Sequence, residues 1–206
     1  MASPLLAQRE RQTVCDLLLA VGPDAPTLCA GWDSADLAAH LVVRERRPDS
    51  GPGIVWAPLA GYTDKVRRSV KDRTPWEKLV ETVRQGPPRL LRPFDGAMNT
   101  IEYFIHAEDV RRAQPDWTPR PLSPELADAL WARLSPGALA KKVPATIVIS
   151  SPGRVDKVAG SGPRLVLTGD PGELTLFASG RQAASKVEIS GDGALAEHLR
   201  TATLGI

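Results

Sequence analysis

Apolar residues recur every three or four positions through most of the first 140 residues, the spacing of one face of a helix. Glycine or proline follows most of these periodic stretches, where a helix would end. We therefore expect helices over residues 4–21, 34–47, 60–71, 74–85, 97–113 and 123–134. The stretches 49–59, which is rich in glycine and proline and contains Trp56, and 88–96 predict irregular loops.

From residue 145 the pattern changes, because apolar and polar residues alternate in short runs bounded by Gly, Pro, Asp or Ser. Such alternation is typical of strands. It predicts strands over residues 146–150, 164–168, 173–177 and 186–189, followed by a helix over 194–203. The chain is thus predicted to be mainly α, with a helical domain over residues 1–142 and a small α+β domain over 143–206. We expect the small domain to pack on the helical one, because a domain of that size exposes much of its surface when alone.

Composition narrows the functional classes. Of the 206 residues, 42% are apolar and 24% charged, which is typical of a globular protein. The net charge of +2 comes without a basic run, so we expect no nucleic-acid partner. The N-terminus has no signal-peptide pattern and no apolar stretch approaches the roughly 20 residues that span a bilayer, so we expect a cytoplasmic protein without a membrane partner. Cys15 and Cys29 are then expected to be reduced thiols.

One stretch, Asn99–Arg112, carries the strongest sign of chemistry. Glu102 and His106 are four residues apart, so on a helix they lie on the same face one turn apart. His40 lies beside the apolar face of another predicted helix. Two imidazoles and a carboxylate suit Zn²⁺ with an open fourth position, and also suit Fe²⁺ or Ni²⁺. Asp109, three residues after His106, could orient an imidazole or act as a further ligand.

Plainer interpretations stand beside this one. A glutamate four residues before a histidine is common on solvated helices and needs no metal. His198 lies in the last predicted helix among charged residues and is interpreted as a surface residue. Cys15 lies on an apolar stripe, and for both cysteines core packing is preferred to a nucleophilic role. Arg111 and Arg112 can pair with the acidic residues one turn earlier, which explains them without nucleic acid.

Two segments, Trp32–Leu41 and Asn99–Ala113, resemble the mycothiol-dependent maleylpyruvate isomerase family of actinobacterial proteins. The resemblance is strongest to a metal-binding subfamily of mostly unassigned reaction and covers roughly residues 5–140. It implies a DinB-like four-helix bundle of the up-down-down-up type, with zinc held by the residues that match the family's ligands, which are His40, Glu102 and His106. Relatives often have a second histidine where this chain has Ala107, which weakens any case for a fourth ligand.

The C-terminal part resembles the small sterol-carrier-like α+β domain of such proteins, through Ala178–Arg181 and Val187–Asp192. The resemblance implies that Arg181 covers the metal site and binds a carboxylate, as a planar guanidinium does well. A surface position after the turn glycine is the other interpretation of this arginine.

The function implied is that of a metal-dependent isomerase or S-transferase that uses mycothiol and a small electrophilic substrate. Coordination by zinc would hold the thiol as thiolate at neutral pH, ready to attack the electrophile. Two alternatives remain open, namely a non-catalytic metal- or ligand-binding module and a hydrolase whose metal activates water. The chain is expected to be a monomer or a homodimer.

Overall fold

The computed structural model describes residues 4–47, 60–88 and 97–205. These residues form two compact units, Met1–Thr118 and Pro119–Ile206, which are described separately. The loop expected over residues 49–59, with Trp56, lies outside the described residues, as does nearly all of the loop expected over 88–96.

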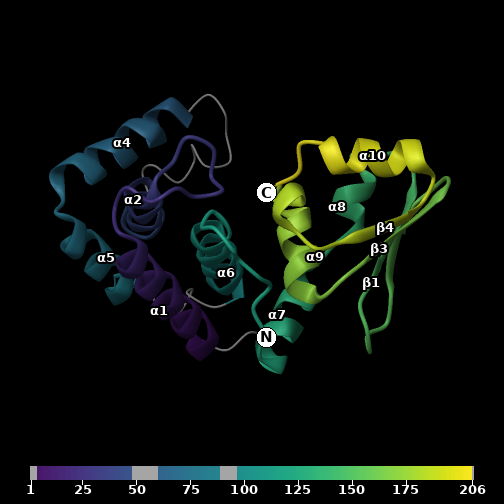
Figure 1. Ribbon diagram of the computed structural model, residues 1–206, viewed down its shortest axis with the longest axis horizontal. Coiled ribbons are helices and arrows are strands. Elements are labelled where there is room, and N and C mark those ends of the chain that lie inside the picture. The colour runs from purple at the N-terminus through teal and green to yellow at the C-terminus, as the bar shows by residue number, and fades with distance from the viewer. Residues whose placement is uncertain (1–3, 48–59, 89–96, 206) are drawn as a thin grey trace. The chain divides into compact units, whose positions relative to one another are not determined.

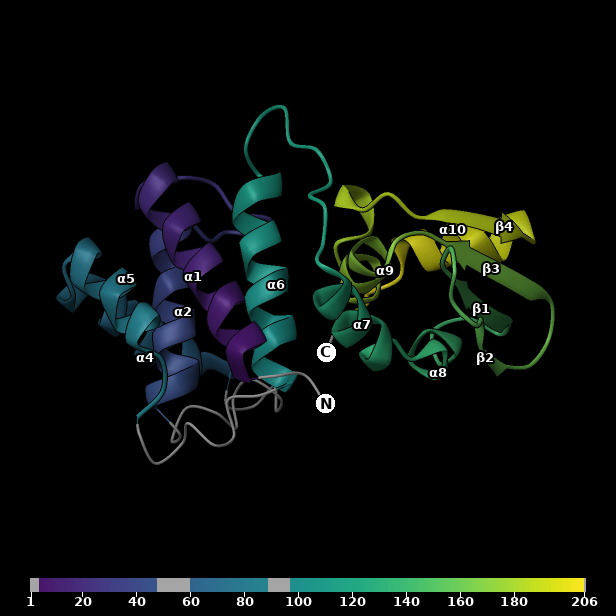
Figure 2. The ribbon, with the colours of Figure 1, turned by 90° about the horizontal axis from the view of Figure 1, so that it is seen from below.

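The first unit is helical (Figures 1 and 2). It consists of α1 (Pro4–Val21), α2 (Ser34–Arg46), α4 (Ala60–Arg73), α5 (Trp76–Gln85) and α6 (Ala97–Arg112). Helix α1 packs on α5 and α6, and α2 packs on α4 and α5. The predicted apolar faces meet in one core, which includes Val14, Leu18, Leu37, Leu41, Leu79, Val83, Tyr103 and Val110.

The start of α2 is fixed by a reciprocal cap. The Asp33 carboxylate accepts the backbone N–H of Asp36 at 2.8 Å, and the Asp36 carboxylate accepts the backbone N–H of Asp33 at 3.4 Å. Each acceptor satisfies a donor that a helix start leaves unpaired. This capping box fixes where the helix that carries His40 begins after the preceding loop.

The second unit combines short helices with a small sheet (Figure 1). Its elements are α7 (Pro124–Arg133), α8 (Pro136–Ala140), β1 (Thr146–Ser150), β2 (Lys157–Gly160), β3 (Arg164–Thr168), α9 (Pro171–Ala178), η3 (Gln182–Ala184), β4 (Glu188–Gly191) and α10 (Gly193–Thr201). The strand order is β2-β1-β3-β4, with β1 parallel to β3 and the other neighbours antiparallel.

The packing of the second unit explains where the chain divides. Ile147 and Leu165 on the sheet share one core with Leu134 and Leu139, which lie at the end of α7 and in α8. Helix α7 also packs on α9. The division expected between residues 142 and 143 therefore falls inside the second compact unit, because these helices bury their apolar residues against the sheet.

One predicted element is wrong, because residues 173–177 form part of α9 and not a strand. The segment carries helix-start signals, with Asp170 at the N-cap, Pro171 in the first turn and Glu173 just inside. Leu174 and Thr175 are both buried, so the apolar alternation reflected no exposed face. Neither β2 nor α8 was expected, and β4 begins two residues later than the strand predicted over 186–189.

In outline the described residues are mostly helical, with a small four-stranded sheet, as the sequence predicted. The type of helical bundle stays a prediction. Within the described residues, no helix is both long and apolar enough to cross a membrane.

Candidate metal centre

Two helices of the first unit bring together the three predicted ligands. His40 comes from α2, and Glu102 and His106 come from consecutive turns of α6. Nε2 of His106 lies 3.5 Å from Oε2 of Glu102, and the rings of His40 and His106 lie 5.2 Å apart between centroids. One ligand atom from each residue can be chosen so that all three lie within 4.8 Å of one another. The set converges on one point, as coordination requires.

Asp109 approaches the opposite edge of the same imidazole. Its Oδ2 lies 3.0 Å from Nδ1 of His106, and the carboxylate is fully buried. With Nδ1 as the donor to Asp109, the lone pair of a neutral ring is left on Nε2, the atom nearest Glu102. Asp109 thus has the geometry of the carboxylates that orient metal-binding histidines.

No pattern in the sequence indicates that Cys29 belongs to this site, and the sequence favours a place in the core. Its Sγ lies 3.2 Å from Oδ2 of Asp109, although the two residues are 80 positions apart. The backbone N–H of Leu28 also donates to the carbonyl of Asp109 at 3.0 Å. Cys29, His106 and Asp109 form a second group of possible metal ligands. Only the tertiary fold reveals this group, because the contact depends on how the loop before α2 packs on α6.

The surroundings set the charge of each candidate ligand. Burial, aided by the charge of His106, lowers the pKa of His40 to about 3, so this imidazole is neutral at pH 7. Burial alone would raise the pKa of Glu102, but the hydrogen bond from His106 and the charge of Arg44 lower it to about 2. His40 and Glu102 are therefore in the protonation states that bind a metal.

His106 differs from the other two. Burial opposes its charged form, but hydrogen bonds to Asp109, Cys29 and Glu102 outweigh burial and raise its pKa well above the usual value. Without a metal the ring is thus held as an imidazolium between two carboxylates. A cation that binds Nε2 must displace that proton.

Arg44 adds a positive charge beside the three residues. It lies one turn after His40 on α2, with Nε 3.8 Å from Oε2 of Glu102. Its Nη1 donates to Oδ1 of Asn99 at 2.5 Å, which ties α2 to the start of α6. The guanidinium is mostly buried, so its charge is only partly screened by water.

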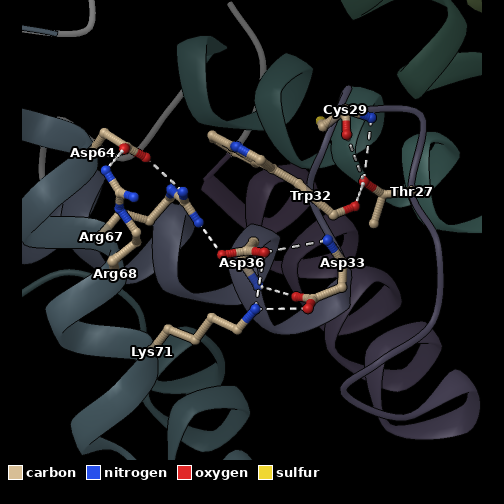
Figure 3. A network of polar contacts seen from close by, with 9 residues as sticks. All are labelled: Thr27, Cys29, Trp32, Asp33, Asp36, Asp64, Arg67, Arg68 and Lys71. Atoms are coloured by element: carbon tan, nitrogen blue, oxygen red, sulfur yellow. Dashed lines mark hydrogen bonds and ion pairs between the residues drawn. The ribbon is translucent and has the colours of Figure 1, made fainter. Parts of the chain in front are cut away.

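A polar network outside the site holds the aromatic neighbour of His40 (Figure 3). The Trp32 ring lies 5.1 Å from the ring of His40, and the guanidinium of Arg67 lies 4.6 Å from the centroid of Trp32. Arg67 is in turn bound by the Asp36 carboxylate, which also accepts a bond from Lys71 at 2.9 Å. Helix α4 thus fixes the residue that packs against His40.

The other residues singled out from the sequence lie elsewhere. Cys15 is fully buried in the core of the first unit, as expected. His198 is exposed, with Nε2 3.1 Å from the carbonyl oxygen of Lys142, in keeping with a surface role. Arg181 belongs to the second unit, where its Nη1 donates to the carbonyl of Ser179 at 2.5 Å. A catalytic role for Arg181 stays a prediction.

Comparison with known proteins supports the fold. No protein-family profile matches the chain, and no curated protein is detectably similar in sequence. Two solved structures are similar, both described as the mycothiol-dependent maleylpyruvate isomerase, one of them a histidine-to-alanine mutant. Their TM-scores are 0.60 and 0.56, with 16% identity and 91% of each chain covered. At this identity the similarity establishes a shared fold and leaves the activity open.

Proposed function

We propose that this chain is a metal-dependent enzyme that activates a low-molecular-weight thiol for attack on a small electrophilic substrate. The observation that carries the proposal is the convergence of His40, Glu102 and His106 from two helices, with ligand atoms within 4.8 Å of one another. The similarity in fold to structures described as a mycothiol-dependent isomerase supports mycothiol as the thiol. The reaction would be an isomerisation or a thiol transfer.

The three residues fit a divalent cation. Two imidazoles and one carboxylate are the ligand set of many zinc sites that keep a position open for a further ligand. His40 and Glu102 already have the required charge, and Asp109 sets the ring of His106 so that Nε2 faces inward. Zinc is the proposed metal, with Fe²⁺ and Ni²⁺ as alternatives that the same ligands would accept.

The bound metal would supply acidity, since a coordinated thiol loses its proton near neutral pH. The protein's own residues favour anionic ligands there. The positive charge of Arg44 lies 3.8 Å from Glu102, so part of its attraction would be available to an anionic group once Glu102 binds a cation. A thiolate or a substrate carboxylate is such a group.

The proposal is tested by incubating the zinc-loaded protein with mycothiol and a panel of unsaturated keto acids and epoxides. We expect turnover that depends on the thiol and falls at least about a hundredfold in Glu102→Gln, because the variant loses a ligand charge. Glu77→Gln is the matched control, since Glu77 is exposed on α5 and outside the site. It should keep full activity.

Two other results would contradict the proposed function. Turnover that is equal with and without thiol would contradict thiol activation and indicate a hydrolase. Neither thiol binding nor turnover across the panel, in a protein that still binds zinc, would contradict an enzyme and leave a metal-binding module.

A further inference from the structure

We propose that Cys29, Asp109 and the Nδ1 atom of His106 form a second metal site, specific for thiophilic cations, which shares its histidine with the first. The three residues combine a thiol, a carboxylate and an imidazole, and their ligand atoms lie within 4.8 Å of one another. A thiolate ligand favours soft cations such as Cu⁺ and Cd²⁺ over harder ones.

The spacing of the donor atoms fits coordination. Oδ2 of Asp109 lies 3.0 Å from Nδ1 of His106 and 3.2 Å from Sγ of Cys29. Bonds of about 2.0 Å to nitrogen or oxygen and 2.3 Å to sulfur, as around Zn²⁺, place tetrahedral ligands about 3.3–3.6 Å apart. Around an ion of that size, these two separations need to open by only a few tenths of an ångström.

The protein holds these donors in place from two elements. His106 and Asp109 lie on adjacent turns of α6, which fixes their relative position. Cys29 lies on the loop before α2, where its backbone N–H donates to Oγ1 of Thr27 at 3.2 Å. The neighbouring Leu28 N–H donates to the Asp109 carbonyl, so the loop is attached to α6 at the residue that supplies the carboxylate. Such prior ordering lowers the entropy cost of binding.

The exposure of the donors and the protons released on binding also agree with a second metal site. Asp109 and His106 are buried, whereas Cys29 is partly exposed to solvent. A cation from solvent would therefore reach the group at Cys29. Binding would release the thiol proton of Cys29 and the Nδ1 proton of His106. With Nδ1 bound to a cation, the neutral ring carries its one proton on Nε2, which lies 3.5 Å from Oε2 of Glu102. The second site therefore does not need the first to be occupied.

The shared ring couples the two sites. The first set uses Nε2 of His106 and the second uses Nδ1, so both can be filled only if the imidazole loses both protons. Filling one site should therefore weaken the other, and by linkage the effect on affinity is the same in both directions. A thiophilic cation would thus inhibit the proposed enzyme without displacing Glu102 or His40.

The test is a Cd²⁺ titration followed by the ultraviolet absorption of the cadmium–thiolate bond. We expect the wild-type protein and Glu102→Gln to show this band. Cys29→Ser, which keeps a hydrogen-bond donor to Asp109, should lose it, and Asp109→Asn should bind Cd²⁺ at least about tenfold more weakly. Cys15→Ala is the control, because Cys15 is the other thiol of the chain and lies in the core.

Several outcomes would overturn the proposal. These are a wild-type protein without the band, a band that persists in Cys29→Ser, or a band that disappears in Cys15→Ala while circular dichroism shows that the variant is folded. The first outcome would reduce Cys29 to a hydrogen-bonded contact of Asp109. Because Glu102→Gln removes only the first site, failure of the second site is distinguished from failure of the proposed enzyme.

Discussion

His106 lies between two carboxylates, with Asp109 at 3.0 Å from Nδ1 and Glu102 at 3.5 Å from Nε2. The two contacts use opposite edges of one ring. The imidazole can therefore offer Nε2 to a metal while Asp109 fixes its orientation. Asp109, which binds no metal in the first ligand set, is thus expected to influence zinc affinity.

The first prediction concerns this orientation. Asp109→Asn should weaken zinc binding about 10- to 100-fold, because the amide no longer fixes the ring by a charged hydrogen bond. Isothermal titration calorimetry measures the change. Asp72→Asn is the control, since Asp72 is exposed on α4. Equal affinities in the two variants would show that Asp109 does not orient His106.

The second prediction concerns acid stability. The Glu108 carboxylate is fully buried and accepts bonds from Arg111 at 2.7 Å and Arg112 at 2.6 Å. Burial raises its pKa, but the two arginines outweigh burial and lower it below its ordinary value of 4.5. The pKa of Glu108 is thus lower in the folded than in the unfolded protein. The contacts of Glu108 with the two arginines therefore stabilise the fold fully above pH 4.5, and this contribution is lost as the pH falls through the folded pKa.

Glu108→Gln should therefore lower the free energy of unfolding by about 3 kcal/mol at pH 7, because it removes the buried negative charge that both arginines contact. The difference from the wild type should shrink in acid. Urea unfolding at pH 7 and below pH 4 measures both values. A difference that is independent of pH would contradict the assigned charge.

The helices of the first unit could be predicted because their apolar periodicity, caps and breakers agree. The sequence also paired Glu102 with His106 correctly, since residues four apart on a helix must share a face. It placed His40 only as a half-buried histidine. The distance between His40 and α6 depends on packing, which a single sequence does not encode in its local pattern.

Buried polar contacts were the hardest to foresee. The sequence pattern places Arg11 on the charged face of the first helix. In the structure Arg11 is buried, and it donates to Tyr103 at 3.0 Å and to Glu45 at 3.0 Å. The contact of Cys29 with Asp109 was missed for the same reason. Burial of a polar side chain is decided by partners on other elements, which local periodicity cannot identify.

The third prediction concerns the network around Trp32 (Figure 3). Asp36→Asn should lower the free energy of unfolding by about 2 kcal/mol, because it weakens the charged bonds to Arg67 and Lys71. It should also shift the fluorescence of Trp32, which stacks on Arg67. Thermal unfolding and emission spectra provide the measurements. Asp72→Asn, at an exposed position of α4, is the comparison, and equal stability of the two variants would contradict the role given to Asp36.

The fourth prediction distinguishes the two thiols. Burial raises the pKa of Cys15 to about 12 from its ordinary value of 9.0, so its thiolate fraction at neutral pH falls about a thousandfold. Iodoacetamide should therefore modify partly exposed Cys29 in the native protein and leave Cys15 intact until the protein unfolds. Peptide mass spectrometry identifies the modified residue. Alkylation of Cys15 at a rate equal to that of Cys29 would contradict the assigned burial.

The central claim is that His40, Glu102 and His106 bind one divalent metal. The most direct test is the metal content of protein purified from zinc-supplemented medium, compared with His106→Ala and the exposed-site control His198→Ala. We predict about one equivalent of zinc in the wild type and in His198→Ala, and less than about a tenth in His106→Ala. Less than a tenth of an equivalent in the wild type, with no change in His106→Ala, would contradict the account.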